Sequence, residues 1–487
     1  MSKFRHVDFR APEYCADQSL RDAVYRLEGS TTSGWRITRG GEAHLELGPG
    51  YRLLRSRCCG VCSTDLDRHH LPFPLPQITG HELVAEDEAG GRHVVEINAS
   101  HRARGLATDC AYCGVGLDHH CPDRLVLGIH DLPGGFGPWV LAPIASVIAL
   151  PDSLPDESAV LIEPFAAALR GVDRIEPRAG DTIAVLGTRR LGQLMLAALS
   201  ARRRATGGRW RIVGLSRHRG LRALALGLGA DEALAPPAID ASTGGIADVV
   251  VDTTASPDGL VLATALAGRE VHLKSTHGQP GGGLAYPTEL VVDEISLVRI
   301  TEADVAAGAA DLTQLGSIRP NGRALVAWLS SAPPPRAWLE RAELIVSTDA
   351  CAVFDTLASR THDLPAADVA VVDDARSVDA ALRPRARTER SLVRPEGEIW
   401  IRPGTGAGAA ASPLVAAIAG RGLRLSSSRC GSFHDALALL EHDAELRTAL
   451  RRLITHRFPA SALEEALRTA RGPDCIKVLV EHPDAKG

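Results

Sequence analysis

Hydrophobic residues change their spacing along the chain, and each change marks a region of different predicted structure. From Trp35 onward, short segments rich in β-branched and aliphatic residues are separated by Gly and Pro, which is typical of a compact β-rich domain. The clearest predicted strands of this domain, which we place at 35–165, are 51–57, 93–97 and 139–142. Residues 1–34 carry mixed charge without such a pattern, and we assign them to an N-terminal extension.

Strands and helices alternate in the next region, 166–298. A segment with helical spacing at 158–175 leads to a continuous apolar run at 183–186, after which Leu194, Met195 and Ala198 recur at helical spacing. Further predicted elements are strands at 211–215, 248–252 and 270–274 and a helix at 220–228. Continuous apolar strands joined by helices predict a parallel sheet of Rossmann type, with its ligand at the carboxyl ends of the strands.

The alternation is interrupted after a strand predicted at 291–298. Residues 299–427 contain strand-like segments at 343–347, 367–372 and 398–401 with helix-like segments between them, and we assign them to an inserted α/β subdomain. Residues 428–487, with a helix at 433–440 and a strand at 476–480, return to complete the earlier domains. The predicted fold class is therefore α/β.

Length and charge narrow the functional classes. A chain of 487 residues predicts two or three domains. The net charge of −5 and the pI near 6.4 show no basic excess, so we expect no nucleic acid and no membrane as a partner. The first residues lack a signal pattern, and apolar runs such as 413–419 are too short to span a bilayer, so we expect a cytoplasmic protein.

Candidate metal ligands lie in G-V-C-S-T-D-L at 60–66 and I-T-G-H-E at 78–82. Cys62 offers a soft thiolate and His81 a neutral imidazole, a pair that suits zinc, and Thr64 and Glu82 place a hydroxyl and a carboxylate beside them. Glu163 precedes a proline that fits the first turn of a helix, so its carboxylate is expected at a helix start that faces a cleft between two domains.

A second group of thiols is formed by Cys110, Cys113 and Cys121 within one short segment. In a reducing compartment such crowding favours a metal site over disulfides. Three thiols are one ligand short of a closed tetrahedral zinc site.

The order of these motifs resembles the zinc-dependent medium-chain alcohol dehydrogenases, most closely the branch with threonine, sorbitol and glucose dehydrogenases. The resemblance covers about 35–298 and 428–483. It rests on G-V-C-S-T-D-L, T-G-H-E, the cysteine group, I-E-P-F-A-A-A-L, G-T-R-R-L-G and V-D-T-T-A-S-P-D-G. It implies a GroES-like catalytic domain, a Rossmann domain with a cleft between the two, and assembly into homo-dimers or homo-tetramers.

The resemblance also implies roles for individual residues. Cys62, His81 and Glu163 correspond to the ligands of the catalytic zinc, with Glu82 as a fourth or alternating ligand. Two anionic ligands and one neutral ligand leave an open position, where the metal lowers the pKa of a substrate hydroxyl. Thr64 corresponds to the hydroxyl that removes the proton, and Asp67, His69 or His70 could extend that relay. The resulting alkoxide then passes hydride to a nicotinamide.

The nucleotide turn departs from the family pattern G-x-G-x-x-G. Gly187 and Gly192 are retained, with Leu191 between them as a further cofactor-binding candidate, but Arg189 replaces the middle glycine, which normally lets the backbone approach the pyrophosphate. Either the Arg189 guanidinium pairs with a phosphate, or dinucleotide affinity is reduced or lost.

Cofactor choice depends on the end of the second Rossmann strand, which reads Ser216-Arg217-His218-Arg219. A carboxylate there would bond the ribose hydroxyls of NAD, whereas Arg217 and Arg219 would accommodate a 2′-phosphate. The sequence therefore favours NADP over NAD.

The structural zinc site departs from the family pattern too, because its first ligand falls on Ala107. The candidates to replace it are Asp109, His101, His119 and His120, and the alternative is a knuckle that holds no metal.

Two functional hypotheses follow. The first is a zinc-dependent oxidoreductase that transfers hydride between NAD(P) and a secondary alcohol, polyol, cyclitol or sugar, or the corresponding carbonyl. The second is a non-catalytic binding or scaffold protein with the same fold and a degenerate dinucleotide site.

Overall fold

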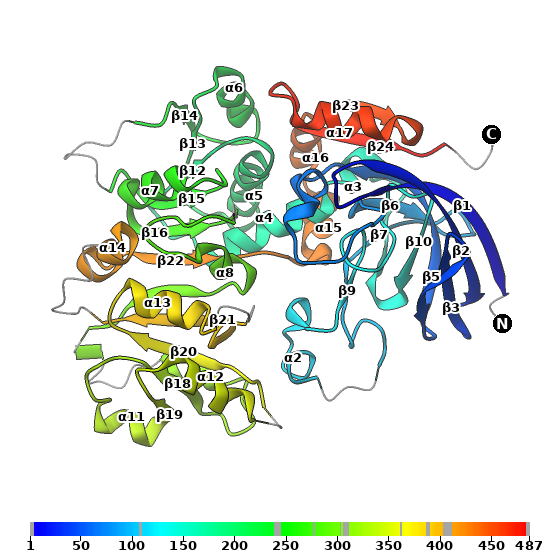
Figure 1. Ribbon diagram of the computed structural model, residues 1–487. Helices are drawn as coiled ribbons and strands as arrows, with labels where there is room; N and C mark the ends of the chain where they lie inside the picture. The colour runs from blue at the N-terminus through cyan, green and yellow to red at the C-terminus, as the bar shows by residue number, and fades with distance from the viewer. Residues whose placement is uncertain are drawn as a thin grey trace. The chain divides into compact units, whose positions relative to one another are not determined.

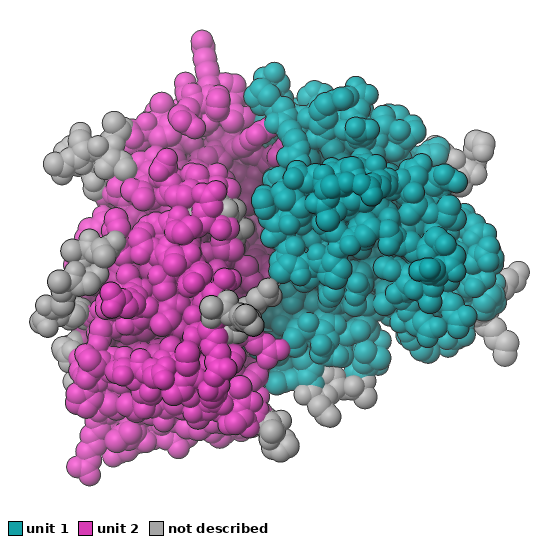
Figure 2. Space-filling view, viewed as in Figure 1, with its two compact units in different colours: residues 1–166, 431–487 teal, residues 167–430 magenta. Residues whose placement is uncertain are grey.

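The computed structural model describes residues 4–106, 110–237, 245–275, 278–301, 303–304, 311–360, 363–385, 390–402 and 412–483. The chain divides into two compact units, which Figure 2 colours separately. The first unit contains 1–166 and 431–487, and the second contains 167–430. Both ends of the chain therefore build the first unit. Within the described part of the chain, no helix combines the length and apolar character that a membrane span requires.

The first unit begins with a four-stranded antiparallel sheet in the order β1-β2-β3-β4. Its strands are β1 (Arg5–Tyr14), β2 (Leu20–Ser30), β3 (Gly34–Arg39) and β4 (Glu42–Leu47). Alternate residues such as Phe9, Ala11, Tyr25 and Leu27 are buried, while charged residues occupy the opposite face. The N-terminal extension thus forms two long strands whose mixed charge is that of a solvated sheet face.

The second sheet of this unit has seven strands in the order β11-β7-β6-β5-β24-β23, with β10 also paired to β5. The C-terminal strand β24 lies antiparallel to β5, with Leu479 opposite Gly60, and so reaches the segment that carries Cys62. The strands are β5 (Tyr51–Gly60), β6 (Glu82–Glu86), β7 (Arg92–Val95), β10 (Trp139–Pro143), β11 (Val147–Ala149), β23 (Ile454–Pro459) and β24 (Lys477–Glu481).

Shorter elements complete the first unit. A two-stranded ladder joins β8 (Asn98–Ala99) and β9 (Leu125–Val126) beside the cysteine group. The helices are α1 (Ser63–Leu66), α2 (Ala111–Gly114), α3 (Asp156–Ala159), α15 (Phe433–His442), α16 (Ala444–Arg451) and α17 (Leu463–Arg471), and α4 (Ile162–Ile175) continues into the second unit.

The second unit contains one sheet of eleven strands, shown in green, yellow and orange in Figure 1. Six of its strands run parallel in the order β14-β13-β12-β15-β16-β22, which we call the nucleotide half. This is the strand order of the Rossmann fold, and the predicted fold class is confirmed. The strands are β12 (Thr182–Leu186), β13 (Arg211–Leu215), β14 (Glu232–Leu234), β15 (Ala247–Asp252), β16 (Ala267–Leu273) and β22 (Arg424–Ser427), and the helices between them are α5 (Arg190–Thr206), α6 (Arg219–Gly227) and α7 (Pro257–Leu266).

The insertion extends this same sheet. Five strands in the order β17-β21-β20-β18-β19 run parallel to one another and form what we call the inserted half. The first of them, β17, lies almost entirely before the insertion predicted at 299–427. The two halves meet where β17 pairs antiparallel with β22, through Leu297 and Leu425. The strands are β17 (Ser296–Arg299), β18 (Ala324–Trp328), β19 (Ala342–Val346), β20 (Ala367–Val372) and β21 (Val393–Ile401), and the helices are α8 (Pro287–Val292), α10 (Asp311–Gly316), α11 (Arg336–Arg341), α12 (Ala350–Ala358), α13 (Ala375–Leu382) and α14 (Pro413–Arg421).

Two details differ from the sequence prediction. The strand predicted at 291–298 is wrong in its first part, because Pro287 starts α8 and the strand begins only at Ser296. Strand β22 lies within the residues assigned to the insertion, yet it pairs in parallel with β16. Its serines, which hydrogen-bond to His272 of β16 and to the Leu290 carbonyl of α8, hide the apolar signal of a buried strand.

Candidate functional site

The turn from β5 into α1 positions Cys62. Cys62 is the N-cap residue of α1, and the carboxylate of Asp65 accepts a hydrogen bond from the Cys62 backbone N–H at 2.8 Å. The other oxygen of this buried carboxylate accepts from the Gly80 N–H at 3.0 Å. Asp65 therefore holds together the two loops that present Cys62 and His81.

His81 is 4% exposed, and its Nδ1 lies 3.5 Å from the Asp65 carboxylate. Burial lowers the pKa of His81, but Asp65 and Cys62 outweigh that effect and raise it well above its ordinary value. A carboxylate behind a metal-binding imidazole fixes the orientation of the ring, which is the arrangement found around zinc ligands.

Glu82 is fully buried and forms an ion pair with Lys477 of β24, whose Nζ lies 2.6 Å from both carboxylate oxygens. Lys477 also donates to the Val61 carbonyl at 3.2 Å. A Cβ atom at Gly60 would lie only 2.2 Å from the Glu82 carboxylate, so a larger residue there would require Glu82 to shift. The negative charge of Glu82 is thus already compensated beside the Cys62 and His81 segment.

Glu163 lies in the first turn of α4 and is half-buried. Its carboxyl has a pKa raised to about 7, first because burial disfavours the charged form, with Glu82 and Asp65 acting in the same direction. His81 and Lys477 oppose this shift. No residue in the described ranges donates a hydrogen bond to this carboxylate, so a bound cation would suit it.

The donor set of Cys62, His81 and Glu163 suits zinc, with one thiolate, one imidazole and one carboxylate. The three side chains are electrostatic neighbours, but they do not form a group in which all ligand atoms lie within 4.8 Å of one another. Their role as a ligand set stays a prediction.

The predicted proton relay residues have different surroundings. Thr64 is half-buried in α1, whereas Asp67 is exposed and lies 3.3 Å from Arg471. The Nδ1 atom of His69 lies 3.0 Å from the Tyr14 hydroxyl of β1, and its ring centroid is 3.8 Å from that of His70. Of the three residues proposed to extend the relay, Asp67 is thus engaged in an ion pair.

The cysteine group has a fourth partner in His101. The ligand atoms of His101, Cys110, Cys113 and Cys121 all lie within 4.8 Å of one another, and His101 Nδ1 is 3.2 Å from Cys121 Sγ. Three thiols and one imidazole are a common donor set for structural zinc. Burial raises the pKa of the Cys121 thiol to about 11, and a metal would stabilise the thiolate instead.

The other candidates for the fourth ligand either do not belong to this group or lie outside the described residues. His119 contacts Asn98 at 3.3 Å, and His120 is buried outside the four-residue group. Ala107 and Asp109 lie outside the described residues.

The predicted nucleotide turn follows β12. Gly187 has φ +89°, and a Cβ atom at Gly192 would lie 2.5 Å from the Gly187 carbonyl oxygen and 2.8 Å from the Thr253 hydroxyl. Arg189 is the N-cap residue of α5, and half-buried Leu191 follows in the first turn. Both glycines allow the close packing of turn and helix, and the α5 N-terminus is suited to phosphate.

The end of β13 carries the residues predicted to select the cofactor. Ser216 is buried, while Arg217 and Arg219 are exposed, and no carboxylate lies among these residues. Arg222, which the sequence did not single out, donates to the Ser216 and Arg217 carbonyls at 2.7 and 3.1 Å and so fixes this loop.

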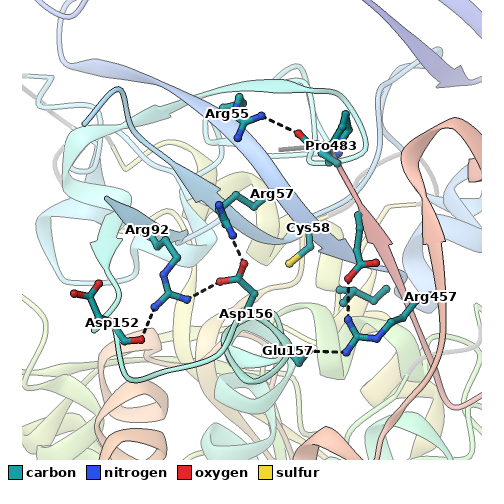
Figure 3. A pocket seen from close by; sticks show the side chains of 12 residues that line it. Arg55, Arg57, Cys58, Arg92, Asp152, Asp156, Glu157, Arg457 and Pro483 are labelled. Carbon is teal, nitrogen blue, oxygen red and sulfur yellow. Dashed lines mark hydrogen bonds and ion pairs between the residues drawn. The ribbon is translucent and has the colours of Figure 1, made fainter. Parts of the chain in front are cut away.

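A separate polar pocket of about 700 Å³ lies in the first unit (Figure 3). Its guanidinium groups are bound to carboxylates of the chain: Arg57 and Arg92 contact Asp156 at 2.9 and 2.7 Å, and Arg457 contacts Glu157 at 3.0 Å. None of the predicted site residues lines it. The paired charges make this pocket part of the framework of the unit.

Two residues of the site were missed by sequence reasoning. Asp65 stands three residues after Cys62, which is the spacing of a capping box, so its contact with the Cys62 N–H had a local signal. The contact of Lys477 with Glu82 had no local signal, because the two residues are 395 positions apart in the sequence.

Part of the first unit matches a known domain family. Residues 48–152 match the alcohol dehydrogenase GroES-like domain. The first unit contains a GroES-like domain. Cys62, His81 and the cysteine group all lie inside the matched range, and together with the Rossmann strand order this gives the chain the fold of the zinc-dependent medium-chain alcohol dehydrogenases.

Relatives of known name match part of the chain. L-threonine 3-dehydrogenase from Rhizobium rhizogenes is 29% identical over 215 residues, which are 42% of this chain and 59% of the relative. The enzyme of the same name from Chelativorans sp. is 32% identical over 134 residues, 26% of this chain and 39% of the relative. The chain thus spans less than two thirds of the length of these relatives.

Solved structures resemble the chain over nearly its whole length. L-idonate 5-dehydrogenase from Escherichia coli has a TM-score of 0.57 at 14% identity, with 98% of this chain and 99% of the other covered. A protein from Sinorhizobium meliloti, described as a zinc-binding dehydrogenase and bound to NADP, has a TM-score of 0.53 at 18% identity, with 98% and 99% covered. At such identities the likeness establishes the fold.

Proposed function

We propose that the chain is a zinc-dependent oxidoreductase that transfers hydride between NAD(P) and a secondary alcohol, polyol, cyclitol or sugar, or the corresponding carbonyl. The observation that carries the proposal is the buried Asp65 carboxylate, which ties the Cys62 and His81 loops together beside the donor-free carboxylate of Glu163. The relatives named L-threonine 3-dehydrogenase support a secondary alcohol as the reacting group.

Cys62, His81 and Glu163 would hold the catalytic zinc, which when bound acts as a Lewis acid and lowers the pKa of the substrate hydroxyl. Asp65 orients the His81 ring. Lys477 compensates the negative charge of Glu82, so the ligand set does not have a second uncompensated carboxylate beside Glu163.

The proton of the substrate hydroxyl needs an exit through side chains of the chain. We assign its removal to Thr64, and its passage to His69 or His70, because Asp67 pairs with Arg471. The hydrogen bond between His69 and Tyr14 would orient that imidazole.

The proposed cofactor is NADP, with NAD as the alternative. The support is the pair of exposed guanidinium groups of Arg217 and Arg219 at the end of β13, where a carboxylate would favour NAD. Arg189 would contact the pyrophosphate at the start of α5.

The proposal extends to the structural metal, the partners and the location. His101, Cys110, Cys113 and Cys121 would hold a second zinc. The substrate is a small molecule, and we propose a cytoplasmic homo-oligomer, a dimer or a tetramer, since thiol ligands stay reduced in the cytoplasm.

Metal analysis of the purified protein tests the proposal. Wild type is expected to hold about two zinc ions per chain, Cys62→Ser to lose one together with oxidoreductase activity, and Cys113→Ser to lose the other. Cys351→Ser, which changes a half-buried thiol of α12, is the matched control and should retain both ions. Wild-type protein without zinc would refute the mechanism.

A second candidate function, a non-catalytic scaffold, is favoured by Arg189 at the middle position of the glycine turn. Titration with NADPH and NADH separates the two. Micromolar binding of either cofactor supports the oxidoreductase, and the absence of binding in a folded, zinc-loaded protein supports the scaffold.

A further inference from the structure

Strand β19 is the last strand of the eleven-stranded sheet on the side of the inserted half (Figure 1). It pairs in parallel with β18, and no strand in the described ranges pairs with its other side. The opposite end of the inserted half is closed, because β17 joins β22 in an antiparallel seam. The outer side of β19 is therefore an open sheet edge, at which the backbone of another strand can bind.

The backbone groups that face outward from β19 belong to Leu344 and Val346. The Ser347 N–H donates to the Trp328 carbonyl of β18 at 3.1 Å, and the backbone groups of successive residues alternate between the two sides of a strand. Residues with odd numbers thus turn toward β18, and those with even numbers turn away from it. The Ala342 carbonyl already accepts a hydrogen bond from a neighbouring guanidinium at 2.9 Å, which leaves the next two even positions.

The side chains of β19 suit a contact surface. Val346 is 55% exposed, and Leu344 and Ile345 are half-buried. The one charged residue of the strand, Glu343, is compensated within the chain, because its carboxylate oxygens lie 2.6 and 3.2 Å from the Arg360 guanidinium. The pairing with β18 has no bulge. The strand therefore offers a regular and largely apolar edge without an uncompensated charge.

Helix α11, which immediately precedes β19, extends this surface. Trp338 of the helix and Leu344 of the strand pack in the same buried cluster, so α11 lies on the face of the sheet from which Leu344 and Val346 project. Leu339 of the helix is 55% exposed. An exposed apolar side chain thus lies on each of the two neighbouring elements.

The other open edges of the described sheets carry features that oppose strand pairing. Strands β8 and β9 have two residues each, and β11 and β14 have three. Strands β1 and β23 carry charged residues and a proline, β4 carries exposed Glu42 and Glu46, and every residue of β10 after Trp139 is buried. Strand β19 combines five residues with one compensated charge and no proline, which makes it the edge best suited to pairing.

We propose that two copies of the chain associate through β19, in an antiparallel pair about a two-fold axis. A pair centred on Ile345 uses all the free backbone groups, because Leu344 of each copy then faces Val346 of the other. A pair centred on Leu344 would place Val346 opposite Ala342, whose carbonyl is already bonded. A pair centred on Glu343 would bring two like charges together. The inference rests on the proposed homo-oligomer and adds the surface through which it forms.

The charges on α11 complement one another under the same axis. Arg336 and Glu340 are both exposed and stand four residues apart. A two-fold axis perpendicular to the sheet reverses the direction of the helix in the second copy, so the cation of one copy comes to the side of the anion of the other.

Sedimentation velocity of the full chain tests the inference. The wild type is expected as a dimer of 51.5 kDa chains, or as a tetramer built from that dimer. Val346→Lys places an ammonium in the edge and should raise the dissociation constant of the pair by roughly tenfold or more. Leu226→Lys changes a side chain of α6 with similar exposure, 52%, and should leave the mass of the assembly unchanged.

A disulfide tests the register. In Ile345→Cys the two introduced thiols would face each other at a pair without mutual backbone hydrogen bonds, where the Cα atoms lie about 4.5 Å apart and a disulfide can form. In Ser347→Cys, the matched control on the same strand, the Cα atoms would lie roughly 13 Å apart and should not link. Mild oxidation and a non-reducing gel measure both, with wild type as the background for the native cysteines.

A wild type that sediments as a single chain would overturn the inference. So would a Val346→Lys variant with the mass of the wild-type assembly, together with an Ile345→Cys variant that does not cross-link. If Val346→Lys does not fold, the cross-link at Ile345→Cys decides alone, and its absence refutes the pairing. Zinc content and NADPH binding of the same wild-type sample test the proposed oxidoreductase separately, because neither requires pairing at β19.

Discussion

The two halves of the eleven-stranded sheet each contain a run of four parallel strands with the same order, β13-β12-β15-β16 and β19-β18-β20-β21, but these runs differ at the carboxyl ends of their strands. In the nucleotide half, β12 lies between β13 and β15, and in the inserted half β18 lies in the same way between β19 and β20. The first residue after β15 is Thr253, whose hydroxyl donates to the Leu186 and Gly187 carbonyls at 3.0 and 2.8 Å. It therefore braces the glycine turn that follows β12.

The corresponding residue after β20 is Asp373. Its carboxylate accepts hydrogen bonds from the Ser330 hydroxyl at 2.6 Å and from the Ser331 N–H and hydroxyl at 2.8 and 2.9 Å. Arg402 donates to the same Ser330 hydroxyl at 2.8 Å. Side chains thus bridge the carboxyl ends of the strands in the inserted half. The comparison indicates that a doubly wound strand order also needs a suitable turn before it can serve as a nucleotide site.

The largest effect is expected in the inserted half, at Asp368. This fully buried carboxylate contacts the Arg319 Nε at 2.9 Å and the Arg394 Nε at 2.6 Å. Asp368→Asn would therefore remove the carboxylate partner of the buried Arg394 and leave Arg319 with Asp363 alone. The free energy of unfolding of the inserted half should fall by about 3–5 kcal/mol, measured by urea denaturation with tryptophan fluorescence.

The exposed Asp355, which pairs with Arg385, is the control for that experiment. Asp355→Asn should change the unfolding midpoint little, because exposed ion pairs contribute little. A loss below about 1 kcal/mol in Asp368→Asn would contradict the view that this network stabilises the inserted half.

The next effect concerns the turn of the nucleotide half. In Gly192→Ala the new Cβ would meet the Gly187 carbonyl at 2.5 Å, so the turn must shift and NADPH affinity should fall about 10- to 100-fold in a fluorescence titration. Gly220→Ala adds the same methyl group in α6, where nothing lies within 4 Å, and should leave affinity unchanged. Equal affinity in both variants would show that the turn does not hold the cofactor.

Sequence reasoning was sufficient where the signal is local. Strands such as β12 and β15 are continuous apolar runs bounded by turn residues, and the structure confirms them. Cys62 and His81 stand in short motifs, and the fold brings their loops together through Asp65, which lies in the same motif as Cys62.

The other features of the fold and of the candidate site depend on contacts between segments that are distant in the sequence. No local pattern links Lys477 to Glu82, or tells that His101, and not His119, joins the cysteine group. The sheet order of the inserted half was equally out of reach, because β17 comes first in the chain yet lies at the seam with β22.

A smaller effect is expected from pH at the fully buried His272 of β16, whose Nδ1 and Nε2 atoms lie 2.7 and 2.9 Å from the Ser426 and Ser428 hydroxyls. The folded-state pKa of His272 is lowered, chiefly by burial, so below about pH 6.5 the unfolded chain binds a proton that the folded chain does not. Stability should therefore decrease as pH falls through this window, by up to about 1.4 kcal/mol per pH unit from this group.

His272→Gln keeps a donor and an acceptor but does not titrate in this range. The variant should be less stable than wild type at pH 7.5, and the difference should shrink toward pH 5.5, as measured by urea denaturation at each pH. A constant difference would show that folding does not lower the pKa of His272, because the folded and unfolded chains would then bind the same number of protons at this position.

The smallest effect is expected from Ser331→Ala, and it compares the carboxyl edge of the inserted half with that of the nucleotide half. Ser331→Ala removes one hydroxyl bond to Asp373 but keeps the backbone N–H bond, so the free energy of unfolding should fall by about 0.5–1.5 kcal/mol. NADPH affinity should not change. Thr253→Ala, the matched variant of the nucleotide half, removes comparable hydroxyl bonds and should also weaken NADPH binding, because they brace Gly187. If Ser331→Ala lowered NADPH affinity as much as Thr253→Ala, the inserted half would have to contribute to the cofactor site.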